Sequence, residues 1–242
     1  MKVDLFLIPG PVSEEKLTGR TTVTIDVLRA STTICQSLKN GARAVIPVQK
    51  PGEAAEMRDK IGVEDTVLAG ERGGIKIESF SLGNSPLEYT KEAVGGKTVV
   101  LTTTNGTQAY ARAKHSDPII TGALVNITSV TKKVVETAQD LVILCAGNGG
   151  NFSIEDSLCG GMLIHKLMDN HNLELKLNDA ASLALLLYRA NCKSLPEAIA
   201  AGEHGRLLAE LGFSEDVKFA ADIDSIPVLP VLKERRIVLD GN

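Results

Sequence analysis

Hydrophobic residues fall into short unbroken runs separated by polar or amphipathic stretches, a pattern typical of strands alternating with helices. Residues 22–27 are a β-branched run that ends in a polar turn, and an expected helix at residues 31–39 follows directly and ends at Asn40-Gly41. Similar runs at residues 97–102 and 140–146 also lead through polar turns into helices. Strands with continuous apolar runs are buried on both faces, so the pattern predicts an α/β protein. We expect layered α/β/α packing around a largely parallel or mixed sheet.

The rest of the chain continues this alternation. Further strands are expected at residues 1–9, 42–48, 66–69, 118–122, 228–231 and 236–239, and further helices at residues 51–60, 107–113, 126–139, 157–168, 179–190 and 196–211. The proline at position 47 indicates an edge strand or a strand end. Residues 179–190 are apolar on every side, which predicts a buried helix. Residues 70–86 show no apolar period and predict a long functional loop. Without a visible linker, we predict a single domain over residues 1–242.

Composition restricts the class of protein. The net charge is −4, aromatic residues make up 3% and tryptophan is absent, so no nucleic-acid-binding surface is expected. No apolar run is long enough to span a membrane, and the N-terminus does not have the pattern of a signal peptide. The four cysteines are scattered without a metal-binding or disulfide spacing, so we expect a cytoplasmic protein.

Charged and polar residues gather where the predicted strands end. Asp26 and Arg29 follow one strand, and Glu71 and Arg72 follow another. Carboxylates of this kind suit Mg²⁺, arginines bind phosphate or sulfonate oxygens, and the N-terminus of a helix attracts anions. The alternative is that each acid and its neighbouring arginine form a local salt bridge, and that Ser31 merely caps a helix.

Most familiar phosphate-handling motifs are missing. The glycine-rich residues 147–152 end in Phe152, which spoils a dinucleotide-binding pattern, and no Walker loop occurs. Asp26 lacks the second acid of a haloacid-type phosphatase, and Cys145 lacks the arginine of a cysteine phosphatase. No serine-hydrolase elbow is present either. His115, His165, His171 and His204 show no metal-binding spacing and are expected to be surface or helix residues.

An ordered set of motifs nevertheless resembles one family. The motifs are Thr24-Ile25-Asp26-Val27-Leu28-Arg29-Ala30-Ser31-Thr32-Thr33, Gly70-Glu71-Arg72-Gly73-Gly74-Ile75-Lys76-Ile77, Leu82-Gly83-Asn84-Ser85-Pro86, Thr102-Thr103-Thr104-Asn105-Gly106-Thr107, Cys145-Ala146-Gly147 and Glu155-Asp156. Together they resemble the 2-phosphosulfolactate phosphatases, the magnesium-dependent phosphatases of coenzyme M biosynthesis. Ser81 stands where we expect an aspartate in that family, so no metal or acid role is assigned to it.

The resemblance implies hydrolysis of 2-phospho-3-sulfolactate to 3-sulfolactate and phosphate, on a fold unlike the common phosphatase folds. The expected catalytic residues are Asp26, Arg29 and Glu71, and the expected Mg²⁺ ligands are Asp26, Glu71 and Asp156. The expected substrate-binding residues are Ser31, Thr32, Thr33, Arg72, Asn84, Ser85, Thr104, Asn105, Gly106 and Thr107.

The partner is then a small anionic substrate, and a homo-oligomer is compatible with such an enzyme. We predict that Asp26, Glu71, Asn105 and Asp156 converge at one end of a single sheet. Two alternatives stay open. One is a non-catalytic binding protein for small phosphorylated or sulfonated acids, and the other is a nucleotide-dependent oxidoreductase that uses the Gly147 loop.

Overall fold

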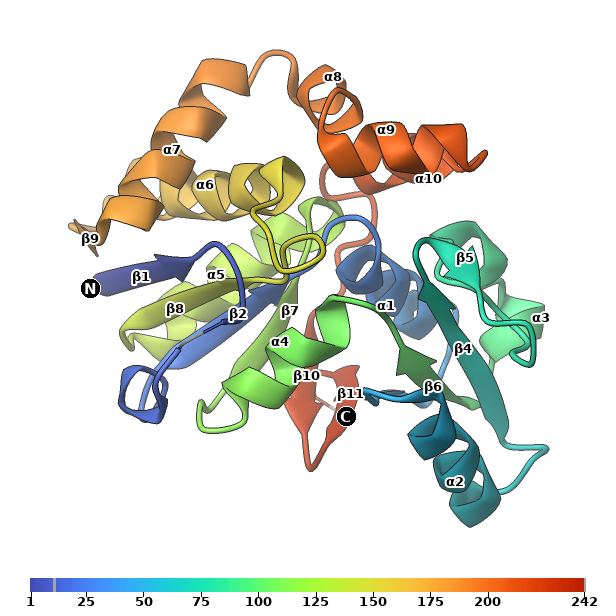
Figure 1. Cartoon of the computed structure of the whole chain (residues 1–242). Coiled ribbons are helices and arrows are strands. Elements are labelled where there is room, and N and C mark those ends of the chain that lie inside the picture. The colour runs from blue at the N-terminus through green and yellow to red at the C-terminus, as the bar shows by residue number, and fades with distance from the viewer. Residues whose placement is uncertain (11, 242) are drawn as a thin grey trace.

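The computed structural model describes residues 1–10 and 12–241, and it confirms the predicted α/β class (Figure 1). Its strands are β1 (Lys2–Phe6), β2 (Thr21–Ile25), β3 (Ala44–Pro47), β4 (Thr66–Arg72), β5 (Ile75–Lys76), β6 (Thr98–Thr102), β7 (Ile119–Gly122), β8 (Leu141–Cys145), β9 (Lys176–Leu177), β10 (Pro230–Lys233) and β11 (Arg236–Leu239). Its α-helices are α1 (Ala30–Lys39), α2 (Pro51–Ile61), α3 (Lys91–Val94), α4 (Gly106–Ala113), α5 (Ile127–Thr137), α6 (Ile154–Asp169), α7 (Asp179–Asn191), α8 (Leu195–Ala200), α9 (Glu203–Glu210) and α10 (Ser214–Ala220), and short 3₁₀ helices cover Glu14–Lys16, Pro86–Glu88 and Leu124–Asn126.

These strands form one mixed sheet in the order β5-β4-β6-β3-β11-β10-β7-β2-β8-β1-β9. One group, from β7 to β9, is parallel throughout, and β3, β6 and β4 form a second parallel group. The hairpin β10–β11 lies between the groups and pairs antiparallel with both, through Val231 opposite Ile120 and Ile237 opposite Val45. The pairings β7–β10, β10–β11 and β11–β3 are all antiparallel, so the strands of the two groups run in opposite directions.

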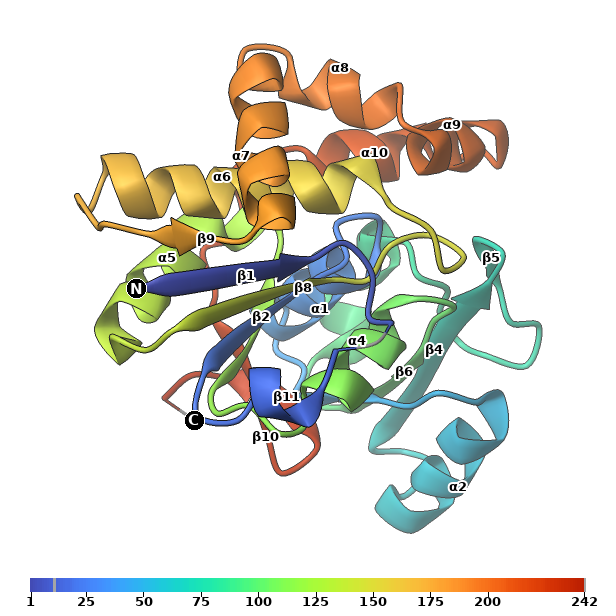
Figure 2. The ribbon, with the colours of Figure 1, turned by 60° about the vertical axis from the view of Figure 1, so that its left-hand side comes forward.

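Alternating strand residues explain the layers. Leu141 and Ile143 of β8 join a core cluster with residues of α5, α6 and α7, whereas Val142 and Leu144 join a second cluster with residues of α1 and α4. Successive side chains of a strand point to opposite faces, so both faces of β8 need a helical cover. The observed arrangement is therefore α/β/α, as the unbroken apolar runs predict (Figure 2).

The region expected to be a long loop is partly regular. Strand β4 continues to Arg72, turns through Gly73 and Gly74, which both have positive φ, and pairs antiparallel with β5. The expected loop at residues 70–86 is therefore wrong for its first part, because Glu71 and Arg72 extend β4 by pairing with β5. The strand at residues 42–48 is interior rather than an edge, and Pro47 stands at its end.

Three helix predictions need correction. The expected single helix at residues 196–211 is two helices, α8 and α9, separated at Ala201 and Gly202, and α10 follows them. Helix α6 begins at Ile154 rather than at residue 157, so Glu155 and Asp156 lie in its first turn.

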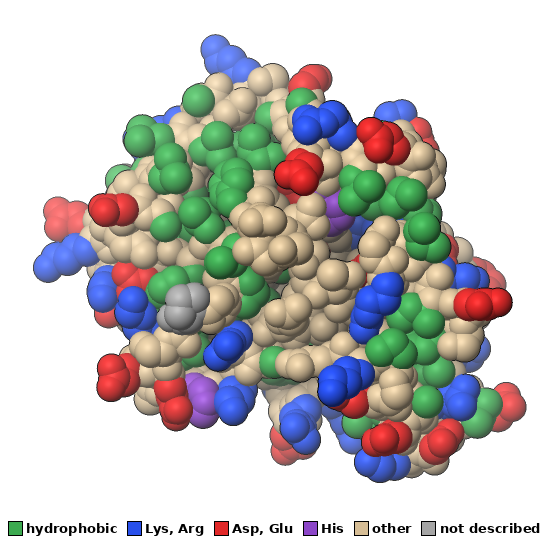
Figure 3. Space-filling model, viewed as in Figure 1, with side chains coloured by type: hydrophobic (Ala, Val, Ile, Leu, Met, Phe, Trp, Pro, Cys, Tyr) green, Lys and Arg blue, Asp and Glu red, His purple; other side chains and the backbone are tan. Residues whose placement is uncertain are grey.

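Helix α7 is not buried on every side. Leu183 and Leu186 are 53% and 64% exposed, and Figure 3 shows apolar side chains gathered over this part of the surface. The sequence pattern overestimates burial because α7 packs on α6 with one face only. No helix among the described residues is both long and apolar enough to cross a membrane.

Candidate active site

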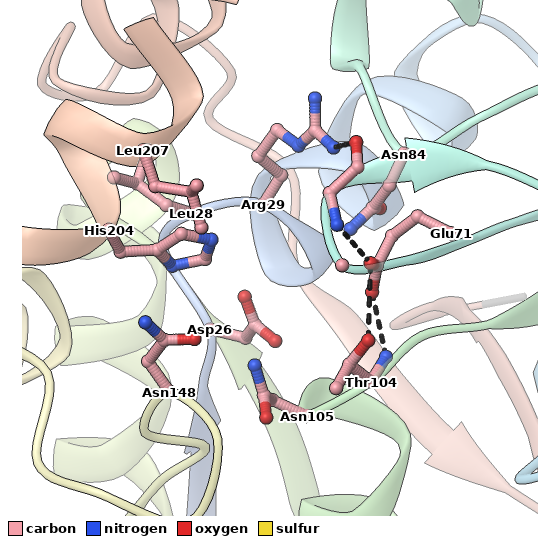
Figure 4. A pocket seen from close by; sticks show the side chains of 12 residues that line it. Asp26, Leu28, Arg29, Glu71, Asn84, Thr104, Asn105, Asn148, His204 and Leu207 are labelled. Atoms are coloured by element: carbon pink, nitrogen blue, oxygen red, sulfur yellow. Dashed lines mark hydrogen bonds between the residues drawn. The ribbon is translucent and has the colours of Figure 1, made fainter. Parts of the chain in front are cut away.

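A pocket opens where loops from both parallel groups of strands meet helix α9 (Figure 4). Its lining residues are Asp26, Leu28, Arg29, Glu71, Gly73, Gly74, Asn84, Thr104, Asn105, Asn148, His204 and Leu207. The carboxyl ends of β2, β4, β6 and β8 all contribute, although the two groups run in opposite directions, so the sheet must fold around the β10–β11 hairpin (Figure 1). Of the four residues predicted to converge, Asp26, Glu71 and Asn105 therefore meet in one pocket, whereas Asp156 does not line it.

Asp26 stands at the centre of this pocket as the first residue after β2. The Ala30 N–H donates to Asp26 Oδ1 at 3.0 Å, and the Asp26 N–H donates to the Ser31 hydroxyl at 3.0 Å, so the start of α1 fixes the carboxylate. Asp26 Oδ2 has no hydrogen-bond partner among residues 1–10 and 12–241. A Cβ atom at Gly106 would lie 2.5 Å from Oδ2, so only glycine at the start of α4 leaves room for this oxygen.

The surroundings of Asp26 disfavour its negative charge. The pKa of Asp26 is raised to about 6, mainly by burial; the positive charge of His204 and the Ala30 N–H bond lower it, and the negative charges of Glu71 and Glu155 add to the rise. A carboxylate held beside other carboxylates in this way is expected to bind a cation or a proton.

Glu71 connects the two neighbouring strands of the second group. Its Oε1 accepts from the Thr104 N–H at 2.7 Å, and its Oε2 accepts from the Gly74 N–H at 2.8 Å and the Thr104 hydroxyl at 3.2 Å. Figure 4 shows this carboxylate across the pocket from His204, with Asp26 between them. Glu71 and Asp26 are therefore the two acids that line the pocket within the described part of the chain.

Asp156 connects two loops instead of lining the pocket. Its Oδ1 accepts from the Val27 N–H at 2.8 Å, and its Oδ2 accepts from the Gly147 N–H at 3.0 Å. Burial, with the nearby charges of Glu155 and Asp26, raises the pKa of Asp156 well above its usual value. Asp156 is not among the lining residues, so the structure places it as a support for the Asp26 turn rather than among the pocket-facing metal donors.

Arg29 is held by an acid far away in the sequence. Its Nη1 forms a 2.7 Å ion pair with Asp216 of α10, its Nη2 donates to the Gly74 carbonyl at 2.7 Å, and its guanidinium lies 4.4 Å from the centre of the Phe213 ring. Asp216 also accepts from the Ser85 hydroxyl at 2.6 Å. The local pairing of Arg29 with Asp26 considered as an alternative does not occur.

Arg72 lies outside the pocket. Its guanidinium donates to the Glu71 carbonyl at 2.6 Å, the Gln49 carbonyl at 3.0 Å and the Thr102 hydroxyl at 2.9 Å. Neighbouring residues of a strand point to opposite faces, so Glu71 and Arg72 cannot both face the ligand. The structure thus separates these two residues, which the sequence analysis groups together.

Several hydroxyls that we expected to bind substrate are bonded to protein atoms. Thr32 donates to the Val27 carbonyl at 2.8 Å, Thr33 to the Asn84 carbonyl at 2.8 Å, and Thr107 to the Thr103 carbonyl at 3.2 Å. With Ser31 and Ser85, they lie outside the pocket lining and shape the turns around it.

Residues that the sequence analysis does not select complete the pocket. His204 and Leu207 come from α9, and Asn148 comes from the glycine-rich loop after β8. The glycine-rich loop after a buried strand is a signal that could have pointed to Asn148. No local sequence signal indicates that His204 reaches the pocket, because its position depends on how α9 packs against distant segments.

The pocket offers oxygen donors suited to Mg²⁺. Asp26 Oδ2 is free, Glu71 is a carboxylate, and Asn84 Oδ1 is buried without a hydrogen-bond partner. Among the described residues no group of three or more His, Cys, Asp or Glu side chains is placed to hold a metal. Mg²⁺ usually binds one or two carboxylates and completes its shell with water and substrate oxygens, so the donor set fits this ion.

Known proteins resemble this chain over nearly its whole length. A family model described as 2-phosphosulpholactate phosphatase matches residues 6–235. The chain belongs to this family. Family members named "Probable 2-phosphosulfolactate phosphatase" include one from Clostridium beijerinckii, 36% identical over 99% of this chain and 100% of its own length. Another, from Clostridium acetobutylicum, is 38% identical over 95% of this chain and 97% of its own, and one from Caldanaerobacter subterraneus is 39% identical over 92% and 91%.

The 2-phosphosulfolactate phosphatase resemblance drawn from the motifs is therefore confirmed, and it identifies the chain as a phosphoric monoester hydrolase of this family. Four of its motifs, around Asp26, Glu71, Asn84 and Asn105, supply lining residues of the same pocket.

Proposed function

We propose that this chain is a Mg²⁺-dependent phosphatase that hydrolyses 2-phospho-3-sulfolactate to 3-sulfolactate and phosphate. The observation that carries the proposal is the buried Asp26, held at the meeting point of the family motifs with one carboxylate oxygen free. As part of the same proposal, we place this activity in coenzyme M biosynthesis and in the cytoplasm.

The charges of the pocket support a metal requirement. Asp26 and Glu71 face the pocket, whereas Arg29 is already paired with Asp216. A substrate that carries phosphate, sulfonate and carboxylate groups would be repelled by these acids unless a cation lies between them. Asp26, Glu71 and Asn84 would hold Mg²⁺, which when bound stabilises negative charge on phosphoryl oxygens and lowers the pKa of bound water.

The other lining residues position the substrate. Phosphoryl transfer depends mainly on orientation and charge stabilisation. The amides of Asn105 and Asn148 point toward Asp26 from two loops (Figure 4), and the Gly149 N–H fixes Asn105 Oδ1 at 3.1 Å. Buried Leu28 and Leu207, which is 38% exposed, exclude part of the solvent from the reacting bond.

The direct test is release of inorganic phosphate from 2-phospho-3-sulfolactate and 2-phospholactate. We expect release with Mg²⁺, loss of release with EDTA, and recovery when Mg²⁺ is added back in excess. No release from either ester would refute the proposal, and tight binding without turnover, unaffected by EDTA, would establish the non-catalytic alternative. Phosphate release that is unaffected by EDTA would show that the reaction does not require a metal ion.

A further inference from the structure

Two helix starts that are far apart in the sequence meet beside the pocket. Glu155 lies in the first turn of α6, and His204 lies in the first turn of α9. Gly202, just before α9, allows this contact, because a Cβ atom there would lie 2.6 Å from Ile154 Cγ2. Since real Cβ atoms do not approach so closely, a larger residue would push α9 away from α6.

The contact pairs a histidine with a buried carboxylate. His204 Nδ1 lies 3.3 Å from Glu155 Oε1, and the side chains are 13% and 2% exposed. Glu155 Oε2 is buried and has no hydrogen-bond partner among the residues that the structure describes. A buried carboxylate is costly unless it is paired, so His204 is the group that compensates Glu155.

The opposite edge of the histidine ring is left for the ligand. Figure 4 shows His204 reaching from α9 toward the middle of the pocket, above Asp26 and beside Leu207. With Nδ1 turned to Glu155, the remaining ring nitrogen is Nε2, and it has no protein partner within residues 1–10 and 12–241. A carboxylate on one nitrogen fixes the orientation of the ring and presents the other nitrogen for proton transfer.

The reaction needs such a group. The leaving oxygen of a 2-phospho acid becomes the alkoxide of a secondary alcohol, which is strongly basic and departs poorly without a proton. Arg29 cannot serve, because a guanidinium does not deprotonate in proteins. We propose that His204 Nε2 donates a proton to the ester oxygen as it leaves phosphorus, with Glu155 as the positioning residue. This inference rests on the proposed phosphatase function.

The step balances without any further reactant. Water oxygen forms the new bond to phosphorus, the bond between phosphorus and the ester oxygen breaks, and its electron pair stays on the ester oxygen. That oxygen takes the proton of Nε2 and departs as the hydroxyl group of the 2-hydroxy acid. The product, which carries both protons of the water, returns one to Nε2 and leaves as hydrogen phosphate.

The test compares two esters that differ mainly in leaving-group basicity, 2-phospholactate and 2-phospho-3,3,3-trifluorolactate. With His204→Gln we expect kcat for 2-phospholactate to fall by about 10²–10⁴-fold. For the trifluoro ester, whose alkoxide is less basic, the fall in kcat caused by His204→Gln should be at least tenfold smaller. Glu155→Gln should show a smaller loss with the same dependence on the leaving group. His115→Gln is the control, since His115 pairs with Glu14 at 3.0 Å on the surface, and both esters should react normally.

The outcomes separate the two proposals. A wild-type protein inactive on both esters and on 2-phospho-3-sulfolactate would refute the phosphatase function and, with it, this role of His204. An active wild type whose His204→Gln variant slows equally on both esters would overturn the proton-donor role alone. If His204→Gln does not fold, as judged by thermal unfolding, Glu155→Gln decides by the same leaving-group comparison.

Discussion

Replacing Asp26 by asparagine is expected to lower kcat by about 10³-fold or more, because the proposed metal site would lose its central carboxylate, and a bound metal contributes several kcal/mol of charge stabilisation. Asparagine has almost the same shape and removes one negative charge from a pocket that also contains Glu71. Binding of the products 3-sulfolactate and phosphate should therefore be kept or strengthened. Steady-state kinetics and calorimetric titration of the variant test both halves of this expectation.

Asp65→Asn provides the control for the same chemical change. Asp65 pairs with Arg43 at 3.0 Å, and its side chain is 52% exposed, so this variant should keep the wild-type kcat. If Asp26→Asn retained a nearly normal kcat while Asp65→Asn did the same, Asp26 would be only a structural residue of the β2–α1 turn.

Asp26→Asn should lower activity but raise the stability of the folded protein at neutral pH. The folded-state pKa of Asp26 is about 6, above the 3.8 of an aspartate in an unfolded chain, so between these pH values the folded protein holds a proton that the unfolded chain has released. The free energy of unfolding therefore falls as pH rises from about 4 to about 6, and stays lower above that, by an amount on the order of a few kcal/mol. In EDTA, Asp26→Asn should melt at a higher temperature than wild type at pH 7, with little difference near pH 4. Added Mg²⁺ should raise the melting temperature of wild type but not of Asp26→Asn.

Arg29→Ala is expected to destabilise the fold by about 3–5 kcal/mol, because it leaves the Asp216 carboxylate buried without its charge partner. Both side chains are 2% exposed, so solvent cannot compensate for the loss. At roughly 2–4 °C per kcal/mol for a chain of this size, thermal unfolding should show a drop of about 6–20 °C. The double variant Arg29→Met with Asp216→Leu should be much less destabilised than the sum of its single variants.

A matched surface pair provides the comparison for Arg29. Arg43 and Asp65 form a similar ion pair at 3.0 Å with side chains 62% and 52% exposed, and Arg43→Ala should shift the melting temperature by no more than a few degrees. Equal small shifts for Arg29→Ala and Arg43→Ala would show that the buried pair does not hold α10 against the pocket.

Local sequence signals predicted the framework of the site well. The strand before Asp26 follows from a run of β-branched residues, and the helix after it follows from the change to helical spacing. Both signals depend on neighbouring residues only. Asp26, Glu71, Thr104 and Asn105 therefore reach the pocket as expected from their places near the strand ends, whereas Asn84 was expected only from the family resemblance. Strand alternation could also have placed Arg72 on the opposite face from Glu71, had β4 been extended through residues 70–72.

The rest depends on contacts between distant segments. Nothing near Arg29 in the sequence indicates that its partner is Asp216, which lies 187 residues away. His204 reaches the pocket only because the helix is interrupted at Gly202 and the first turn of α9 meets the first turn of α6. A single continuous helix at residues 196–211 would have carried it elsewhere. The two backbone bonds to Asp156 likewise join loops that the sequence keeps apart.

A crystal structure of the protein grown with Mg²⁺, phosphate and 3-sulfolactate tests most directly that hydrolysis takes place in the pocket around Asp26. The account predicts Mg²⁺ on Asp26 and Glu71 with phosphate as a further ligand, and the 2-hydroxyl of 3-sulfolactate at about 3 Å from His204 Nε2. Products bound away from this pocket, with Asp26 and His204 touching neither metal nor ligand, would contradict it.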